Sequence, residues 1–459
     1  MDYISTRDAQ AAPVGFVDAL LGGLAPDGGL YVPTAWPQLD MADLAGRPYA
    51  KAAEAVLSPF IGDAIEPAVL RRMLADTYAP PAFAHQSVAP LRQLGPDLWL
   101  MELFHGPTIA FKDVALQLLG RLFDHALAQR GARATILGAT SGDTGSAAIE
   151  GCRGRSNIDV FILYPAGRVS EVQRRQMTTV DAPNVHAVAV QGTFDDCQAL
   201  VKVAFADGAF RREQSLAAVN SINWARIAAQ VVYYAAACAA LRAPVRFAVP
   251  TGNFGNVLAG WVARRMGAPV AGLHIATNAN DILARFFATG VMEAAPAVAA
   301  TLSPSMDIQV SSNFERYLFE VLDRDARALA ALMQQFRQNG RFAVGKDVMT
   351  RARADFAATR CDDADTLAAM RRCYAETGVV VDPHTAVGLS AAYAAQHEGP
   401  MVALACAHPA KFPDAAERAL GLRPALPPHL ADLLDRPERT ETIPADLPAV
   451  QRFIRERTA

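Results

Sequence analysis

Apolar runs that alternate with glycine-rich turns and helical stretches leave few architectures open to this chain. The clearest example is ATILGA at 134–139, an expected strand, followed by the turn SGDTG, the helical stretch SAAIEGC and a second expected strand, IDVFILY at 158–164. A strand, a helix and a strand in this order form a βαβ unit, which predicts a parallel sheet with helices on both faces. We therefore expect an α/β fold.

The alternation begins near Leu98 and falls into two groups. In the first group, VHAVAVQ at 185–191 is a further strand, and Thr193 with Asp196 predicts a capping box at the start of a helix that reaches Ala206. The second group is expected to contain a helix at 225–241, strands at 245–249 and 270–276, a helical region at 313–375 and a strand at 401–407.

Three parts of the chain follow from this pattern. Residues 1–95 are rich in Gly and Pro turns with short helical stretches between them, and we expect them to form an appended amino-terminal domain. Residues 96–220 are the expected smaller αβ lobe. Residues 221–459 are the expected larger lobe, which includes a proline-rich carboxy-terminal tail and a last short helix.

Composition excludes several classes of function. The chain has 459 residues, 52% of them hydrophobic and 19% charged, as in globular proteins. A formal net charge of -3 leaves no excess of positive charge for nucleic acid or an anionic membrane. The first ten residues contain no apolar signal segment, and the most apolar stretch, Val231–Leu241, is shorter than the roughly 18 residues of a membrane span. We expect a cytoplasmic protein without nucleic-acid or membrane partners.

The six cysteines are scattered, and no two of them form a CxxC pair. This spacing is typical of reduced thiols and not of a zinc site or a disulfide framework. We therefore expect no structural metal.

Lys112 follows an apolar, turn-rich segment, FHGPTIAF, and directly precedes an amphipathic helix whose apolar positions recur from Leu118 to Leu127. Apolar surroundings disfavour the ammonium form of a lysine, which makes the neutral amine available for a Schiff base. A solvated lysine near a helix start fits the same letters. Lys112 alone leaves both interpretations open.

Two glycine-rich turns each lie between an expected strand and an expected helix, where bare N–H groups and the helix dipole favour anions. TSGDTG at 140–145 suits a carboxylate, and PTGNFGN at 250–256 suits a phosphate, although it is neither GxGxxG nor a Walker loop. Each turn taken alone also fits a capped turn without a ligand. With Lys112 they provide what an imine-bound, phosphorylated aldehyde cofactor and an amino-acid substrate need.

The stretches FHGPTIAFKD, ATSGDTG, PTGNFGN and AHPAKF, in this order, resemble the threonine synthases, pyridoxal phosphate enzymes of the tryptophan synthase β-subunit fold. The opening YISTR and GLAPDGGLYVP resemble the amino-terminal domain of the bacterial and fungal branch, so the resemblance covers nearly the whole chain. It implies fold type II, with two αβ lobes that have parallel-rich sheets and an added amino-terminal domain.

The resemblance also implies roles for residues. Lys112 would bind pyridoxal 5'-phosphate covalently and later move protons between substrate carbons. The cofactor phosphate would lie on Gly252, Asn253, Phe254, Gly255 and Asn256. The substrate carboxylate and the 3′-oxygen side of the cofactor would contact Ser141, Gly142, Asp143 and Thr144. Many relatives on this fold have Asn in place of Asp143.

Cys406 departs from the family pattern, because familiar members have a threonine there whose hydroxyl faces the pyridine nitrogen. A thiol is a weaker hydrogen-bond partner than a hydroxyl, so the tuning of the ring would differ. A small buried residue at the end of a strand explains Cys406 equally well.

The substrate of the family, O-phospho-L-homoserine, needs a second phosphate site, which Arg or Lys side chains suit. Our candidates are Asn313 and Arg316, near an expected helix start. Other polar residues in family-like stretches are His105, Ser312, Lys346, Asp382, His384 and Lys411. Each of these also fits a cap, a turn or a surface charge.

The implied enzyme is a carbon–oxygen lyase that releases phosphate from the γ carbon and adds water at the β carbon, giving L-threonine in the last step of threonine biosynthesis. An alternative is a threonine or serine dehydratase, or a phosphohomoserine phospho-lyase, on the same fold; 2-oxobutyrate as product would identify it. A rival outside the enzymes is an inactive homologue that binds a phosphorylated amino acid. The sequence leaves open whether the protein is a monomer or a homodimer.

Overall fold

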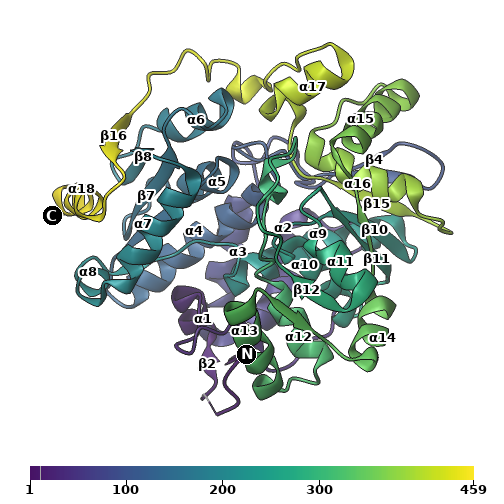
Figure 1. Ribbon diagram of the computed structural model, residues 1–459, viewed down its shortest axis with the longest axis horizontal. Helices are drawn as coiled ribbons and strands as arrows, with labels where there is room; N and C mark the ends of the chain where they lie inside the picture. Colours follow the sequence, from purple (N-terminus) through teal and green to yellow (C-terminus); the bar gives the residue numbers. More distant parts are fainter. Residues whose placement is uncertain (11, 459) are drawn as a thin grey trace. The chain divides into compact units, whose positions relative to one another are not determined.

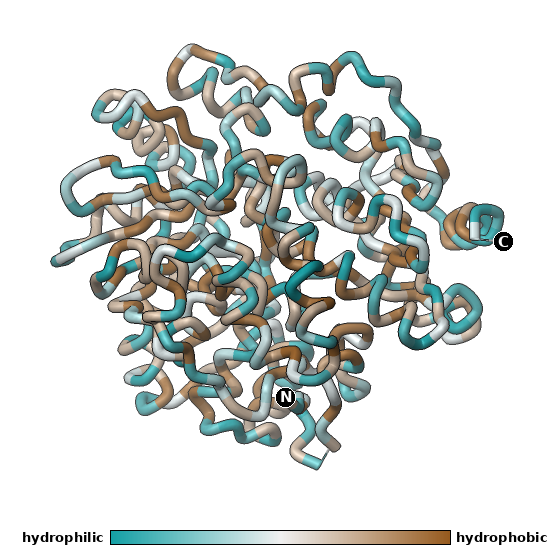
Figure 2. The backbone as a smooth tube through the Cα atoms, turned by 180° about the vertical axis from the view of Figure 1, so that it is seen from behind, coloured by the Kyte–Doolittle hydropathy of each residue, from teal (hydrophilic) through white to brown (hydrophobic). Residues whose placement is uncertain are grey.

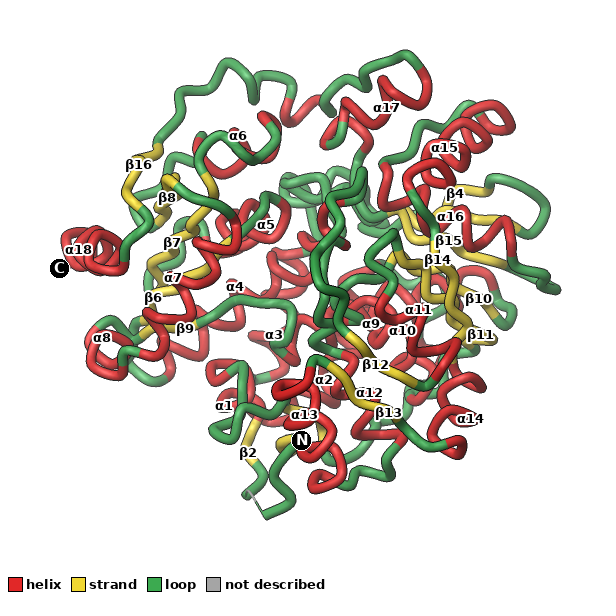
Figure 3. Tube along the Cα trace, in the orientation of Figure 1, coloured by secondary structure: helices red, strands yellow, loops and turns green. Residues whose placement is uncertain are grey.

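The computed structural model describes residues 1–10 and 12–458, and the chain divides into two compact units (Figure 1). Unit 1 consists of Met1–Leu20, Leu24–Phe111 and Ser221–Pro424. Unit 2 consists of Leu21–Gly23, Lys112–Asn220 and Ala425–Ala459. Each unit contains one large sheet with helices packed on it (Figure 3).

The sheet of unit 2 has five parallel strands in the order β16-β8-β7-β6-β9. Their bounds are Ala134–Ala139 for β6, Ile158–Pro165 for β7, Val185–Gln191 for β8, Leu216–Ala217 for β9 and Thr440–Pro444 for β16. The three strands expected in this region are confirmed. The tail differs from its expected place in the larger lobe, because β16 pairs along β8 at the edge of this sheet.

Helices cover both faces of this sheet, as alternation along β7 requires. Phe161 and Leu163 share a core with helices α7 and α18, whereas Ile162 packs against Gly145 of α5 on the other face. The Thr193 capping box at the start of α7 is confirmed. The helices of this unit are α4 (Lys112–Gln129), α5 (Asp143–Cys152), α6 (Glu171–Thr178), α7 (Phe194–Ala206), α8 (Gly208–Glu213) and α18 (Leu447–Thr458).

The main sheet of unit 1 has the order β14-β11-β10-β15-β5-β4, parallel except for β4 against β5. Its strands are β4 (Leu91–Gln93), β5 (Leu98–Glu102), β10 (Val245–Pro250), β11 (Val270–Thr277), β14 (Phe356–Arg360) and β15 (Met401–Ala405). The expectation of helix throughout 313–375 is wrong at two places. Besides α12 (Phe314–Val321), α13 (Ala326–Asn339), α14 (Lys346–Asp355) and α15 (Asp363–Thr377), this region contains β13 (Arg341–Ala343) and β14, which pairs with β11.

The amino-terminal region belongs to unit 1 and has a small antiparallel sheet of its own. Its elements are β1 (Asp2–Ser5), β2 (Val14–Gly15), α1 (Phe16–Gly22), β3 (Tyr31–Pro33), α2 (Tyr49–Ile61) and α3 (Pro67–Thr77). Side chains from later in the chain hold it: the Arg7 guanidinium pairs with Glu315, and Arg324 donates to the carbonyl of Pro33 at 3.1 Å. These contacts make it continuous with the body of the unit.

The remaining helices of unit 1 surround its sheet. They are α9 (Trp224–Leu241), α10 (Gly255–Arg265), α11 (Ile282–Thr289), α16 (Pro383–Ala394) and α17 (Pro413–Leu420), with the short strand β12 (Val291–Glu293) beside β13. Helix α9 has the length and apolarity of a membrane span, but most of it is buried against α2 and α10 in the manner of a core helix. Figure 2 shows hydrophobic and hydrophilic residues interspersed along the chain, as expected for amphipathic helices that cover a sheet.

Candidate active site

Lys112 is the first residue of α4 and follows a loop that is tied to the end of β15. The backbone N–H of Phe111 donates to the Cys406 carbonyl at 2.7 Å. The Lys411 ammonium donates to the Thr108 carbonyl at 2.8 Å and is fully buried. These bonds fix the approach to Lys112, whose own side chain is 8% exposed.

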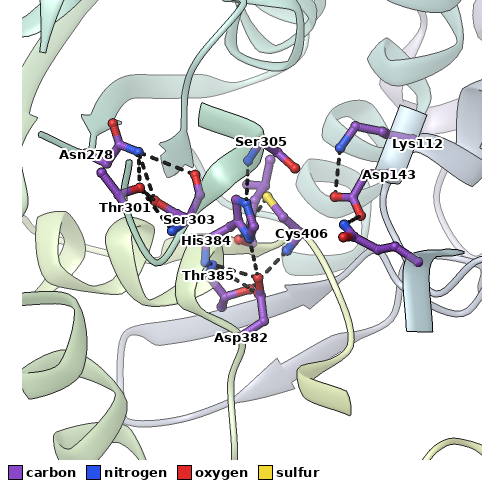
Figure 4. Close-up of polar contacts among 12 residues, drawn as sticks. Lys112, Asp143, Asn278, Thr301, Ser303, Ser305, Asp382, His384, Thr385 and Cys406 are labelled. Atoms are coloured by element: carbon purple, nitrogen blue, oxygen red, sulfur yellow. Dashed lines mark hydrogen bonds and ion pairs between the residues drawn. The ribbon is translucent and has the colours of Figure 1, made fainter. Parts of the chain in front are cut away.

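The side chain of Lys112 contacts Asp143, the first residue of α5 (Figure 4). Lys112 Nζ lies 3.2 Å from Asp143 Oδ2. The other carboxylate oxygen accepts a hydrogen bond from Gln173 Nε2 at 2.8 Å, and Ser170 Oγ in turn donates to Gln173 Oε1 at 2.9 Å. Two residues singled out from the sequence thus form a buried ion pair, and Gln173 orients it.

Close packing of α4 on α5 explains why these two residues meet. A Cβ atom on Gly120 would lie 2.0 Å from the Gly151 carbonyl oxygen, and one on Gly151 would lie 2.3 Å from that of Leu116. The helices therefore touch backbone to backbone. Gly120 and Gly151 lie equally far from the first residues of their helices, which are Lys112 and Asp143. Because the two helices pack in parallel, these first residues lie opposite each other.

The turn before α5 is organised around Thr140 and Gly142. Thr140 Oγ1 accepts from the N–H groups of Gly142 and Gly145 at 3.0 and 2.9 Å. Gly142 has φ of +140°, and a Cβ there would lie 2.4 Å from Gln173 Cδ, so only glycine fits. Ser141 is exposed and Thr144 half-buried, at a helix start without a side-chain cap, a setting that suits an anion.

The turn between β10 and α10 also has the backbone of an anion site. Phe254 adopts the left-handed conformation, with φ of +64°, and α10 starts without a side-chain cap. A Cβ on Gly252 would lie 3.2 Å from Met306 Cα, and one on Gly255 would lie 3.3 Å from Asn313 Nδ2. The backbone here is pressed against the segment around 306–313.

Asn256 supplies an unused hydrogen-bond donor at this turn. Its Oδ1 accepts from the hydroxyls of Tyr233 and Tyr234 at 2.6 and 2.8 Å. Burial raises the pKa of both phenols well above its usual value, so both remain donors. Asn256 Nδ2 is buried and has no hydrogen-bond partner among the described residues. An uncapped helix start with an orphan amide donor fits a phosphate.

Asn313 and Arg316 are buried, and protein acceptors occupy their donors. Asn313 Nδ2 donates to the Asn253 carbonyl at 3.2 Å. Arg316 donates from Nε to the Tyr31 carbonyl at 2.9 Å and from Nη2 to the Ile222 carbonyl at 2.6 Å. These bonds favour a supporting role beside the 252–256 turn, and substrate binding by this pair stays a prediction.

Arg226, in the first turn of α9, is a functional candidate that lies outside all the sequence motifs. It is 4% exposed, its Nη1 has no hydrogen-bond partner, and it forms no ion pair within the described ranges. Burial lowers the pKa of its guanidinium to about 10, against an opposing effect of Tyr233. The sequence signal was a lone charge in an otherwise uncharged helix.

Cys406 lies buried after β15, and its N–H donates to Thr385 Oγ1 at 3.0 Å. Asp382 and His384 are also buried and hydrogen-bond each other at the start of α16, whereas Lys346 is exposed. His105 pairs with Glu102 at 2.9 Å. The candidate residues thus divide between the units: Lys112 and the turn at 141–144 belong to unit 2, and the others belong to unit 1.

Comparison with known families gives three matches along the chain. Residues 2–78 match the model for the threonine synthase N terminus, residues 82–343 the model for pyridoxal-phosphate dependent enzymes, and residues 385–454 the model for the threonine synthase C-terminal region.

Similar proteins cover the chain end to end. The threonine synthase of Pseudomonas aeruginosa is 52% identical over 99% of this chain and 98% of its own. The crystal structure of threonine synthase from Brucella melitensis, described as PLP bound, superposes with a TM-score of 0.97 at 51% identity, over 100% of this chain and 99% of that one. The yeast enzyme superposes with a TM-score of 0.94 at 39% identity, over 100% and 98%.

Proposed function

This chain belongs to the threonine synthase family, and from that premise we propose how its residues convert O-phospho-L-homoserine to L-threonine. The protein is a pyridoxal phosphate enzyme, a carbon–oxygen lyase acting on phosphates, on the type II fold with parallel sheets in two lobes. The observation that carries the residue assignments is the buried contact between Lys112 and Asp143.

Lys112 is the residue that binds the cofactor covalently and handles protons. Bound pyridoxal phosphate supplies an electron sink that acidifies the substrate α carbon. With substrate bound, the free Lys112 amine would remove the α proton and then serve the β carbon, from which a proton must leave before phosphate departs from the γ carbon. Its first-turn position on α4 and its burial support this double task.

Asp143 holds the ammonium form of Lys112 between these proton transfers. The Asp143 carboxylate would repel the carboxylate of the substrate, but it stabilises the Lys112 ammonium, whose Nζ lies 3.2 Å away. Gln173 orients the Asp143 carboxylate for this contact. The substrate carboxylate is then left to the N–H groups and hydroxyls of Ser141, Gly142 and Thr144.

The residues that would hold the cofactor phosphate are those of the turn Gly252, Asn253, Phe254, Gly255 and Asn256, and Cys406 would face the pyridine nitrogen. The orphan Nδ2 of Asn256 and the uncapped start of α10 support this placement. Asn313 and Arg316 brace the turn, and Arg226 supplies the charge for the substrate phosphate.

The experiment follows the cofactor absorption spectrum and the products together. Adding O-phospho-L-homoserine to the holoprotein should shift the absorption band and yield threonine and phosphate in equal amounts. Accumulation of 2-oxobutyrate instead would favour a dehydratase or phospho-lyase.

Lys112→Ala should lose covalent cofactor after borohydride reduction, and Asp143→Asn should keep it but turn over roughly 10²-fold more slowly. Lys202→Ala, a surface change in the same unit, is the control.

We also propose that the protein works in the cytoplasm as a monomer or a homodimer. Light scattering coupled to gel filtration measures the second point, and fractionation of cells measures the first. A larger assembly or a membrane-bound fraction would contradict them.

A further inference from the structure

Asp382 is the N-cap of α16 and accepts four hydrogen bonds from two neighbouring residues (Figure 4). Its Oδ2 accepts from His384 N at 3.0 Å and His384 Nδ1 at 2.7 Å. Its Oδ1 accepts from Thr385 N at 3.1 Å and from the Thr385 hydroxyl. Asp382 is 1% exposed, and in the described part of the chain no lysine or arginine forms an ion pair with it. Capping needs only the backbone bonds, so the side-chain bonds call for another explanation.

The first side-chain bond fixes the tautomer of His384. The backbone N–H of Ser305 lies 3.1 Å from His384 Nε2. Because a backbone N–H only donates, Nε2 must be the acceptor, and Nδ1 carries the proton that is donated to Asp382. Asp382 therefore makes His384 an acceptor for the short 3₁₀ helix Pro304–Met306.

That short helix lies against the 252–256 turn. Met306 Cα is 3.2 Å from where a Cβ on Gly252 would be, and Ser311 Oγ donates to the Gly252 carbonyl at 2.7 Å. On its other side, Asn278 Nδ2 donates to Ser303 Oγ at 3.0 Å. The segment 303–311 is thus held at both ends, and one of its anchors is His384.

The second side-chain bond runs from Asp382 through Thr385 to the end of β15. Thr385 Oγ1 donates to Asp382 and accepts the N–H of Cys406 at 3.0 Å. The Cys406 carbonyl accepts the N–H of Phe111, the residue before Lys112. One carboxylate therefore connects two places that the cofactor is proposed to touch.

We propose that Asp382, His384 and Thr385 are positioning residues that fix the two ends of the cofactor site in unit 1. The His384 branch sets the phosphate turn, and the Thr385 branch sets the backbone at Cys406, which faces the ring. This inference rests on the proposed placement of the cofactor. None of the three residues takes part in the chemistry itself.

The His384 branch is tested with two amides and two forms of the cofactor. His384→Asn keeps a donor for Asp382 but leaves the Ser305 N–H without its acceptor, whereas His384→Gln places an amide oxygen near the position of Nε2. H384N should raise the dissociation constant of pyridoxal phosphate for the apoprotein by roughly tenfold or more, because the part-buried Ser305 N–H loses the acceptor that holds its segment in place. H384Q should restore most of the affinity. Neither should change the affinity for pyridoxal, which lacks the phosphate.

Equal losses for both forms of the cofactor would show a general defect and overturn the inference. Asp325→Asn, a polar substitution at the exposed N-cap of α13, is the control for a general effect of substitution and should change neither affinity. If H384N does not fold, ¹⁵N NMR of the wild-type protein tests the tautomer directly. The His384 Nε2 signal, identified by its absence from the H384Q spectrum, should be that of an unprotonated nitrogen. A protonated Nε2 contradicts the proposed tautomer.

The Thr385 branch is tested by absorption. Thr385→Val removes the acceptor for the Cys406 N–H and should shift the band of the bound cofactor without changing the preference for pyridoxal phosphate over pyridoxal. Thr385→Ser keeps the hydroxyl and should restore the wild-type band. An unshifted band in T385V would overturn this branch.

Asn256→Asp separates failure of the inference from failure of the proposed function. It keeps the acceptor for both tyrosines but replaces the orphan donor with a negative charge, so pyridoxal phosphate affinity should fall about 10²-fold. Unchanged affinity in N256D would place the phosphate elsewhere and defeat the proposed function. A loss in N256D with none in H384N would defeat the positioning role alone.

Discussion

Arg226 is a charged side chain at a position where burial makes charge costly. The other side chains of α9 are uncharged, and Arg226 has no carboxylate partner among the described residues. An unpaired charge in a protein interior costs several kcal/mol, which is comparable to the net free energy of unfolding of a whole domain. Such a residue is retained where a ligand supplies the opposite charge, and a phosphate dianion fits a planar, five-donor guanidinium.

Replacing Arg226 by Gln should raise KM for O-phospho-L-homoserine by roughly 10–10²-fold, because the charge proposed to meet the substrate phosphate is gone. Affinity for pyridoxal phosphate should change less than about threefold. Arg226→Lys should recover only part of the loss. Steady-state kinetics and cofactor titration measure both effects, with exposed Arg242 at the end of the same helix, changed to Gln, as the control.

A second readout of the Arg226 variant does not depend on turnover. Removing an uncompensated buried charge should raise the thermal midpoint of the apoprotein, so R226Q should be more stable and less active. Lost cofactor affinity with an unchanged KM would instead assign Arg226 to the cofactor phosphate.

At the scale of elements, the contact of α4 with α5 positions the lysine that we propose binds the cofactor. The close approach at Gly120 and Gly151 allows no side chain at the crossing. Helix packing without intervening side chains fixes the relative position of both helix starts, and so the contact between Lys112 and Asp143.

Gly151→Ala should therefore affect both stability and turnover. The added methyl group meets backbone atoms that cannot rotate away, and the free energy of unfolding should fall by about 1–3 kcal/mol. Turnover should fall because Lys112 and Asp143 move apart. Urea denaturation and kcat measure the two effects. Gly208→Ala, at the open start of α8, should be neutral within about 0.5 kcal/mol, and a similarly neutral G151A would contradict the packing argument.

Strands that carry their own apolar signal were predictable, whereas strands defined by a distant partner were not. β6, β7 and β8 are runs of buried apolar residues, and each was expected at nearly its observed bounds. β16, with sequence TETIP, is mostly exposed, and β14, with sequence FAATR, is short and polar at its end. Both are strands because β8 and β11 offer them free edges, which the local sequence does not reveal.

The same division applies to the site. Lys112, Asp143 and Asn256 lie in contiguous motifs and could be named from the sequence. Gln173 and Thr385 could not, because their roles depend on contacts with residues 30 and 21 positions away. Contacts of this kind follow from the packing of elements and leave no periodic trace in the sequence.

At the scale of the whole molecule, acid should weaken both units. Burial lowers the pKa of His274 in unit 1, and burial together with nearby Arg457 lowers the pKa of His186 in unit 2, from the ordinary value of 6.5. The unfolded chain therefore takes up protons near pH 6.5 while the folded chain does not. Stability from this source is present above that pH and is lost as pH falls, by up to about 1.4 kcal/mol per pH unit for each histidine.

Denaturation at pH 7.5 and pH 5.5 tests this prediction, and the tryptophans separate the units. Trp36, Trp99, Trp224 and Trp261, the four of the chain, all lie in unit 1, so their fluorescence follows that unit, whereas circular dichroism follows both. His186→Phe keeps the ring that stacks on Phe161 at 4.4 Å and should reduce the acid sensitivity seen by circular dichroism alone. A fluorescence change of the same size would contradict the assignment.

The pairing of β16 with β8 has a consequence for synthesis on the ribosome. The nascent chain makes β8 early, but the strand that covers its outer edge emerges only after residues 221–424, which belong to the other unit. At roughly 5–20 residues per second the delay is on the order of tens of seconds. Throughout that time the open edge of β8 can pair with another nascent chain. The need for chaperones should therefore be set by the arrival of the last strand, and premature termination after Pro424 should yield aggregates.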